Sequence, residues 1–301
     1  MTNQITFTPE ALTRPGRYLI ITAMRNEILT IETTIKSVLS QTMPPKLWLI
    51  LDDGSTDNSS EVVDHYVSQY PWIHRISIPD RGFDFVGKGV ADLLNFGFEQ
   101  VGNIQIEFVS KLDADLSFSE DYYEKLIAKM DKEPDLGIIS GHPYIIKKGK
   151  KVFERHSEYF PSGTARLYRF SYLKEIGPFV SSVGWDTVDI LRMRMLNYKT
   201  RVLSDLPIHH IRRMGTRLGY FDGMTRDGRN NYITGYSTTF FVFRAIYNGK
   251  YYPFFIRTYC MLYGYICAHI NKLPLAVTPQ EHLFHVNLQR KRLGLKKLSK
   301  L

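Results

Sequence analysis

Cysteine is nearly absent from this chain of 301 residues, which limits the structural classes it can belong to. Its two cysteines, Cys260 and Cys267, are too few for a disulfide framework. Both lie in a segment of helical pattern, which predicts ordinary buried thiols in a reducing compartment. Residues 1–15 are polar and lack the apolar core of a signal peptide, so we expect a cytoplasmic location.

Long uninterrupted apolar runs are also missing. The nearest candidate, residues 251–270, contains Pro253, Arg257 and His269, and it falls short of the roughly 18–20 apolar residues of a membrane-spanning helix. No internal repeat or low-complexity linker divides the chain. With 44% hydrophobic residues, the chain can still bury one substantial core.

The N-terminal half alternates between short apolar runs and segments of helical periodicity. Each apolar run has the length of a strand, and apolar side chains then recur every three or four positions. This alternation predicts an α/β fold with a mostly parallel central sheet flanked by helices. We expect strands at 18–22, 47–51, 76–78 and 104–109, and helices at 31–39, from 58 or 59 onward, and at 88–98.

Polar clusters follow three of these predicted strands, at residues 22–27, 52–57 and 111–115. Ligands bind beyond the carboxyl ends of the strands in such sheets, so the three clusters should lie at one edge. In the third cluster, Asp113 and Asp115 point the same way if the segment is extended, as two oxygen ligands of one hard cation would. Taken alone, the two acids fit a solvated loop equally well.

With these clusters in this order, the chain resembles the family 2 glycosyltransferases, which have the Rossmann-like nucleotide-sugar-binding fold called GT-A. The resemblance extends from about residue 17 to 210. It departs at Trp185, where family members often have Glu before the Asp. The segments that carry it are Thr22-Ala-Met-Arg-Asn-Glu27, Ser37-Val-Leu-Ser-Gln-Thr42, Leu51-Asp-Asp-Gly-Ser-Thr-Asp57, Gly87-Lys-Gly89, Leu112-Asp-Ala-Asp115 and Gly184-Trp-Asp-Thr-Val-Asp189.

The resemblance implies an inverting transferase that moves a sugar from a nucleoside diphosphate, with UDP favoured, to a hydroxyl of a glycan or lipid-linked acceptor in polysaccharide biosynthesis. It implies a GT-A domain at 1–234, with a nucleotide-sugar half at about 17–116 and an acceptor half at about 117–234. A helical extension at 235–301 follows. The alternative is a non-catalytic nucleotide-sugar-binding module of the same fold, since the missing Glu could mark lost catalysis.

The first two clusters offer groups for the nucleotide. A carboxylate such as Asp53 can accept a hydrogen bond from a uracil N–H or from ribose hydroxyls. Arg25 and Glu27 would line the same pocket, and the resemblance adds Thr22. Asp52 precedes Asp53, and only one of the two can face the cleft.

Two predicted helix starts border these clusters. Asp57, Asn58 and Ser59 are interpreted as turn and cap residues and not as ligands. Lys88 lies between two glycines at a predicted helix start, where it could bring positive charge and amide donors to the phosphates. A solvated lysine is the equal alternative.

By resemblance, Asp115 is a ligand of a Mn²⁺ or Mg²⁺ ion that bridges the two phosphates of the donor. Asp113 would lean toward the ribose or the metal and its water shell. A fixed dication stabilises the charge of the leaving diphosphate more in the transition state than in the ground state. His209 or His210, expected after a short strand at 201–203, could reach the metal or the diphosphate, and the alternative is a structural histidine.

Asp186 lies at the predicted N-terminus of a helix, where the helix dipole favours a carboxylate. By resemblance, Asp186 is the general base that takes the proton of the acceptor hydroxyl. Asp189, three residues further on, is the reserve base or a residue that supports Asp186. The structural alternative is that Asp186 only caps the helix.

Two further segments are candidates for substrate contacts. Arg212, Arg213 and Arg217, with glycines nearby, could close over the diphosphate as a lid, and a surface charge run is the alternative. Residues 162–165, Ser-Gly-Thr-Ala, resemble the small-residue segment by which similar enzymes approach a sugar.

The segment from residue 235 is strongly aromatic and ends in basic residues, in a chain of net charge +9. Aromatic helices with a basic end suit the surface of an anionic membrane, as in a peripheral membrane protein. A homo-oligomer interface or a contact with the chain's own core is the alternative. The basic residues are dispersed or terminal and accompany no recognition motif, so we expect no nucleic-acid partner.

Overall fold

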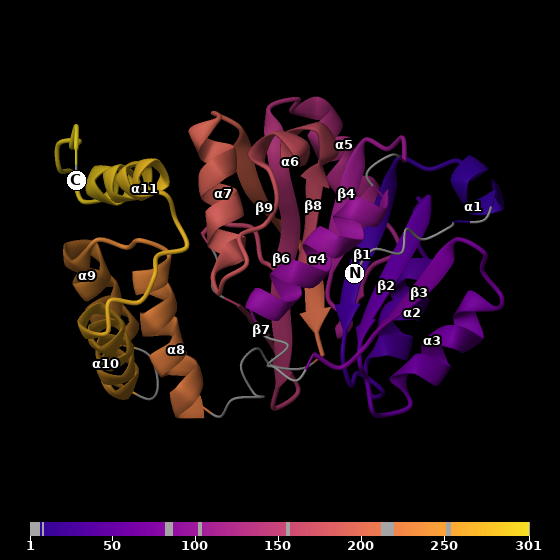
Figure 1. The fold of residues 1–301 in the computed structure, drawn as a ribbon, viewed down its shortest axis with the longest axis horizontal. Helices are drawn as coiled ribbons and strands as arrows, with labels where there is room; N and C mark the ends of the chain where they lie inside the picture. Colours follow the sequence, from indigo (N-terminus) through magenta and orange to yellow (C-terminus); the bar gives the residue numbers. More distant parts are fainter. Residues whose placement is uncertain are drawn as a thin grey trace. The chain divides into compact units, whose positions relative to one another are not determined.

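The computed structural model describes residues 7, 9–81, 87–101, 104–154, 157–211, 220–250 and 254–300. Figure 1 shows their helices and strands. The helices are α1 Pro9–Thr13, α2 Ile31–Leu39, α3 Ser59–Val67, α4 Lys88–Val101, α5 Tyr122–Lys132, α6 Phe170–Ile176, α7 Trp185–Met195, α8 Tyr220–Ile233, α9 Thr238–Asn248, α10 Ile256–Ile270 and α11 Pro279–Arg292. The strands are β1 Tyr18–Met24, β2 Leu47–Asp53, β3 Ile73–Ile78, β4 Phe108–Leu112, β5 Leu116–Phe118, β6 Leu136–Lys147, β7 Lys150–Phe153, β8 Ala165–Arg169 and β9 Lys199–His210.

Within the described residues, the strands form one nine-stranded sheet in the order β3-β2-β1-β4-β8-β6-β9-β5, with β7 paired to β6. The first four strands in this order are parallel. β8 is antiparallel to both β4 and β6, and β9 is parallel to β6 and antiparallel to β5. The predicted α/β fold is confirmed, and its parallel part is the N-terminal half that alternates between strand and helix.

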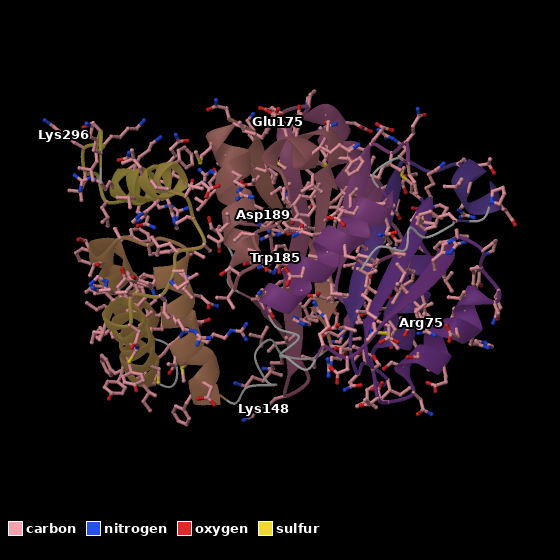
Figure 2. All side chains as sticks on the ribbon, viewed as in Figure 1. Arg75, Lys148, Glu175, Trp185, Asp189 and Lys296 are labelled. Atoms are coloured by element: carbon pink, nitrogen blue, oxygen red, sulfur yellow. The ribbon has the colours of Figure 1, made fainter. Side chains whose placement is uncertain are left out.

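The chain divides into two compact units. The first takes in residues 1–179 and 196–212, and it holds the whole sheet and helices α1 to α6. The second takes in residues 180–195 and 213–301, and it holds α7 to α11. Figure 2 labels Trp185 and Asp189 on α7. The domain boundary expected between residues 234 and 235 falls inside the second unit and stays a prediction.

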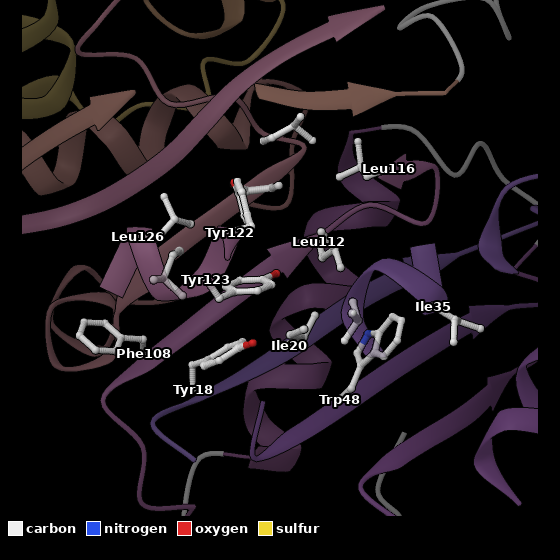
Figure 3. Close-up of a cluster of buried hydrophobic side chains, with 14 of the residues drawn as sticks. Tyr18, Ile20, Ile35, Trp48, Phe108, Leu112, Leu116, Tyr122, Tyr123 and Leu126 are labelled. Carbon is white, nitrogen blue, oxygen red and sulfur yellow. The ribbon is translucent and has the colours of Figure 1, made fainter. Parts of the chain in front are cut away.

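Alternate residues of the parallel strands face opposite sides of the sheet, and each side is covered. Ile20 and Trp48 belong to the main hydrophobic core with side chains of α2 and α5 (Figure 3). Ile21 and Leu51 face α4, where a Cβ added at Gly97 would lie 3.0 Å from a methyl carbon of each. Burying such a side chain contributes about 1.5–3 kcal/mol. Because both faces are filled, polar side chains gather at the strand ends.

Two strands differ from their expected positions. The strand expected at 104–109 lies at Phe108–Leu112, because Ser110 and Lys111 are buried in it with hydrogen-bond partners that their polarity does not reveal. The short strand at 201–203 is part of the longer β9, which pairs with both β6 and β5. His209 and His210 therefore lie in the strand and not after it, and their side chains face opposite sides.

The second unit is helical, as expected for the C-terminal segment. Val188 and Leu191 of α7 pack with Val277 and with Leu288 of α11. Cys260 is buried and Cys267 is half-buried, and both are free thiols. Among the residues described, no helix combines the length and the apolar content that crossing a bilayer requires.

Candidate functional site

The loops after β1 and β2 are tied to each other by hydrogen bonds. Asn26, which has a positive φ of 55°, accepts a hydrogen bond from the N–H of Thr56 at 2.7 Å. Asp57 accepts from the N–H of Ser59 at 3.0 Å and from its hydroxyl. Asn58, at the N-cap position of α3, makes no side-chain cap bond. Asp57 therefore has the turn and cap role expected for it, and the two loops form one rigid polar edge.

Asp52 and Asp53, the last residues of β2, face opposite sides of the sheet. Asp53 is fully buried and accepts two hydrogen bonds from the Arg81 guanidinium, at 2.6 and 2.7 Å. Asp52 accepts from the Ser60 hydroxyl at 2.5 Å and from Arg75 at 3.3 Å. Asp52 is thus held against α3 and β3, and Asp53 is the acid on the side of Arg81.

Asp80 and Arg81 lie two and three residues after the end of β3 and complete this edge. Arg25 donates to Asp80 at 2.9 Å and lies 4.0 Å from Asp53. Arg81 also donates to the Gly89 carbonyl at 3.2 Å, which links it to the start of α4. Sequence reasoning did not select Asp80 and Arg81, although both obey the rule that selected the other clusters, since they follow a parallel strand at its carboxyl end.

Thr22 and Glu27 have partners within the chain. Thr22 is buried, and its hydroxyl accepts from the indole N–H of Trp48 at 2.9 Å. Glu27 is also buried and accepts from the Thr30 hydroxyl at 2.8 Å. Lys88 is the first residue of α4 and is exposed. Nucleotide contacts by these three residues stay predictions.

The acid pair, Asp113 and Asp115, follows β4, and Lys111 and residues 162–165 hold Asp113 in place. Lys111 is buried, and its ammonium donates to Asp113 and to the Gly163 carbonyl, both at 2.5 Å. The N–H of Asp113 donates to the Thr164 carbonyl at 2.8 Å. Burial raises the pKa of the Asp113 carboxyl, Lys111 opposes the rise, and nearby Asp115 adds to it. The segment at 162–165 thus packs against the acid pair.

Asp115 faces His210 at the end of β9. The Nε2 of His210 lies 3.3 Å from Asp115 Oδ2, and its Nδ1 lies 3.3 Å from Glu154 Oε1. Burial lowers the pKa of His210, but the hydrogen bonds to Asp115 and Glu154 outweigh it and raise the pKa to about 10. His209 faces the other side of the strand, and burial lowers its pKa. Of the two histidines, His210 is the one beside the acid pair.

The donor atoms of Asp115 and His210 suit a divalent cation. In the described part of the chain, no three His, Cys, Asp or Glu side chains are grouped so that they could hold a metal ion. The Asp115 carboxylate oxygen nevertheless suits Mn²⁺ or Mg²⁺, because such ions take oxygen ligands and keep several positions for water and substrate phosphates. His210 faces Asp115 and Glu154 with its two ring nitrogens, so it could join the ligands only after it loses a proton. Asp113 has a different partner, the buried Lys111.

Asp186 and Asp189 lie on α7 in the second unit. Asp186 is the second residue of the helix, two positions after the N-cap residue Gly184, so the simple capping interpretation does not hold. It is half-buried, whereas Asp189 is buried and accepts from the N–H of Ile190 at 2.6 Å. Gly184 opens the helix with a positive φ of 78°. Arg212, Arg213 and Arg217 lie outside the described residues.

A cavity of about 290 Å³ lies elsewhere on the first unit. It is lined by residues of α1 and its following turn and by Pro71 and Trp72, which precede β3. It is therefore at the amino end of β3 and contains none of the polar clusters described above.

Comparison with known proteins shows which family this chain is similar to. The family model for glycosyl transferase family 2 matches residues 19–185. The poly-beta-1,6-N-acetyl-D-glucosamine synthase of Staphylococcus epidermidis is 34% identical over 184 residues, which cover 55% of this chain and 41% of that protein. The enzyme of the same name from Staphylococcus aureus strain COL is 32% identical over 130 residues, covering 42% and 28%. The chain spans less than half the length of these curated relatives.

Solved structures are similar in fold. The mannosyltransferase PcManGT from Pyrobaculum calidifontis, in complex with GDP-Man and Mn²⁺, matches with a TM-score of 0.56 and 16% identity, over 97% of this chain and 79% of that one. Residues 1–349 of S. aureus TarS, in complex with UDP-GlcNAc, match with a TM-score of 0.54 and 16% identity, over 91% and 81%. These likenesses confirm the GT-A fold.

Proposed function

Because this chain belongs to glycosyl transferase family 2, we propose that it transfers N-acetylglucosamine from UDP to a hydroxyl of a glycan or lipid-linked acceptor, with inversion at the anomeric carbon. The family membership makes it a glycosyltransferase, and the poly-beta-1,6-N-acetyl-D-glucosamine synthases and the TarS complex with UDP-GlcNAc favour this donor over the GDP-Man of PcManGT. The observation that carries the proposal is the pairing of Asp115 with His210, next to Asp113. This pair lies at the edge of the sheet where β1 and β2 also end and their loops begin.

The donor diphosphate fits the charge at this edge. Asp115 and His210 would hold Mn²⁺ or Mg²⁺, which supplies positive charge to a leaving diphosphate when it is bound. Lys111 holds the Asp113 carboxylate in place, and the 2.5 Å bond to the Gly163 carbonyl fixes Lys111 in turn. We assign Asp113 to the ribose or to the water shell of the metal, and Asp53 and Arg25 to the nucleoside.

Asp186 is assigned as the general base. It is carried by the first turn of α7, at the positive end of the helix dipole. It is half-buried, whereas the reserve residue Asp189 is buried and bonded to its own helix. General-base aid is worth roughly 10²–10⁴ in rate.

The assignment is tested with purified protein, UDP-GlcNAc and Mn²⁺, with an N-acetylglucosamine trisaccharide and an anionic oligosaccharide as alternative acceptors. Release of UDP measures turnover, and proton NMR of the product gives the anomeric configuration, which should be β. Asp186→Asn should lower kcat by at least a hundredfold and leave the affinity for UDP unchanged. The control is Asp222→Asn, which alters an acid in the first turn of another helix of the same unit and should keep full activity. An α-linked product, or loss of UDP affinity in Asp186→Asn, would contradict the assignment.

We place the enzyme at an anionic membrane surface on the cytoplasmic side. Residues 228–280 contain no Asp or Glu but have five basic residues. On α10, one stripe of side chains at helical spacing is more than half exposed: Tyr259, Tyr263, Ile266 and Ile270. Phe255, just before this helix, is 78% exposed and has a positive φ of 60°. Amphipathic helices of this composition bind bilayers through apolar area and basic charge together.

Co-sedimentation with vesicles tests this placement. The wild-type chain should bind vesicles of phosphatidylcholine with 30% phosphatidylglycerol and bind pure phosphatidylcholine weakly. The variant Tyr259→Ser/Tyr263→Ser/Ile266→Ser should lose most of this binding. Phe221→Ser, at an exposed apolar side chain of α8, is the control that should keep it. Equal binding by the triple variant, or a concentration-dependent dimer that the variant abolishes, would favour a subunit interface instead.

A further inference from the structure

The hairpin of β6 and β7 ends in a strongly basic tip. Lys147, Lys148, Lys150 and Lys151 surround Gly149, and all four side chains are exposed. No acidic residue occurs from 136 to 153. Within the described residues, none of the four lysines has an ion pair, and Figure 2 labels Lys148 at this place. Four like charges in five positions repel one another and favour an anionic ligand.

Aromatic rings line one face at the base of the same hairpin. Tyr144 is opposite Phe153 on β7 and opposite His209 on β9. Its ring centroid lies 5.6 Å from that of Phe153 and 5.1 Å from that of His209, which it stacks on at 18°. The ammonium of Lys151 lies 4.7 Å from the Tyr144 ring centroid. Phe153 is 44% exposed. Flat rings of this kind pack well against the C–H faces of sugar rings.

The ring face and the candidate metal ligands are carried by consecutive residues. Glu154 follows Phe153, and His210 follows His209. The side chains of Glu154 and His210 lie on the opposite face of the sheet from the rings, and His210 Nδ1 is 3.3 Å from Glu154 Oε1. His210 in turn contacts Asp115. One residue of a strand spans about 3.3 Å. The ring face is therefore about one residue from the candidate metal ligands along β7 and β9, on the opposite face of the sheet.

We propose that the β6–β7 hairpin is the acceptor site and that it selects a glycan that carries carboxylate or phosphate groups. This inference rests on the proposed transfer reaction and specifies its acceptor. The rings hold the sugar faces, and the lysines bind the acidic groups. A bilayer is the less suitable partner for this element, because the outermost residues are lysine and glycine while the rings lie at the base. A hairpin that inserts into lipid has its apolar residues at the tip.

The backbone conformation of Lys148, at the tip of the hairpin, agrees with a binding role for this turn. Lys148 and Gly149 form the turn with positive φ values of 50° and 72°. A two-residue hairpin turn of this kind favours Asn or Gly at both positions, so a lysine there is held at a cost in backbone energy. Strained residues of this kind cluster at ligand-binding sites, which agrees with a binding role for the tip.

Binding of defined oligosaccharides tests the proposal. The probes are a hyaluronan decasaccharide and a phosphorylated mannan, with chitopentaose as the neutral reference, each titrated calorimetrically into the full chain at 50 and 200 mM salt. The hairpin variant replaces Lys147, Lys148, Lys150 and Lys151 by Gln. The matched control replaces the exposed Lys291, Lys296, Lys297 and Lys300 by Gln, which changes the net charge equally.

We expect the hairpin variant to bind an anionic probe at least tenfold more weakly, with a smaller salt dependence, and to bind the neutral probe as before. The control should bind all probes as the wild type does. Phe153→Ala should weaken the anionic and neutral probes alike, because the ring contacts both. The proposal is overturned if the wild type binds neither anionic probe, if the control loses as much as the hairpin variant, or if the hairpin lysines affect only binding to phosphatidylglycerol vesicles. Binding of UDP in the presence of Mn²⁺ should be unchanged in every variant, so failure of this proposal and failure of the donor assignment give different results.

Discussion

Removing Arg81 should destabilise the first unit, because it leaves the buried Asp53 carboxylate without its main partner. Asp53 is fully buried and both of its oxygens accept from Arg81. Breaking a buried pair by removing one partner costs roughly 3–5 kcal/mol. Arg25 remains 4.0 Å from Asp53, so we expect Arg81→Ala to cost about 3 kcal/mol, at the low end of that range. Asp53→Asn/Arg81→Gln removes both charges and leaves two groups that can bond, so it should cost clearly less than Arg81→Ala.

Urea unfolding followed by tryptophan fluorescence measures these costs, since Trp48 and Trp72 both report on the first unit. The control is Arg17→Ala. Arg17 bonds Glu107 and Asp131 at 2.6–2.8 Å, but these partners are about half exposed, so its loss should cost about 1 kcal/mol or less. The reasoning is refuted if Arg81→Ala costs no more than Arg17→Ala, or if the double variant costs the sum of its parts.

Two further predictions concern the second unit. Burial lowers the pKa of His285 to about 4, so the folded chain keeps this histidine neutral. Its contribution to stability is fully present above about pH 6.5 and is lost as the pH falls toward 4, in total about 3 kcal/mol. His285→Gln should therefore flatten the loss of Tm between pH 6.5 and 4.5. An unchanged pH profile in that variant would show that another group causes the loss. A Cβ at Gly264 of α10 would overlap the Thr225 carbonyl oxygen of α8, so Gly264→Ala should cost about 1–3 kcal/mol in calorimetric unfolding. The control is Gly294→Ala, whose added Cβ meets no atom and which should show only its backbone cost. Equal losses in the two variants would contradict the close packing of α8 and α10.

The sequence predicted the elements whose pattern is local. Ile31, Ile35 and Val38 recur at helical spacing and are all buried, and α2 has the predicted bounds. The strand at β9 was underestimated because Asp205 and Pro207 interrupt its apolar pattern. Its pairing with β5 and β6, which lie far away in the sequence, extends the strand to His210. Tertiary pairing of this kind leaves no local signal.

The same distinction applies to the site. The clusters after β1, β2 and β4 were found by one topological rule, and the third supplies Asp115. The pairing of Asp115 with His210 could not be derived, because it depends on the register of β5 against β9 across about ninety residues. The sequence also left open which of Asp52 and Asp53 faces the cleft. In the structure Arg75 bonds Asp52 and Arg81 bonds Asp53, and which acid contacts the nucleotide stays a prediction.

The central claim is that this edge of the sheet binds a nucleoside diphosphate through a metal ion held by Asp115 and His210. The direct test is a thermal-shift panel with UDP, GDP, CDP and dTDP, each with and without Mn²⁺, on the wild type, Asp115→Asn and the control Asp131→Asn. At 100 times its Kd, a ligand adds about 2.7 kcal/mol of stability. We predict that UDP stabilises the wild type and the control only when Mn²⁺ is present, and that Asp115→Asn abolishes the shift. A shift that needs no metal and persists in Asp115→Asn, or no shift with any nucleotide, would contradict the claim.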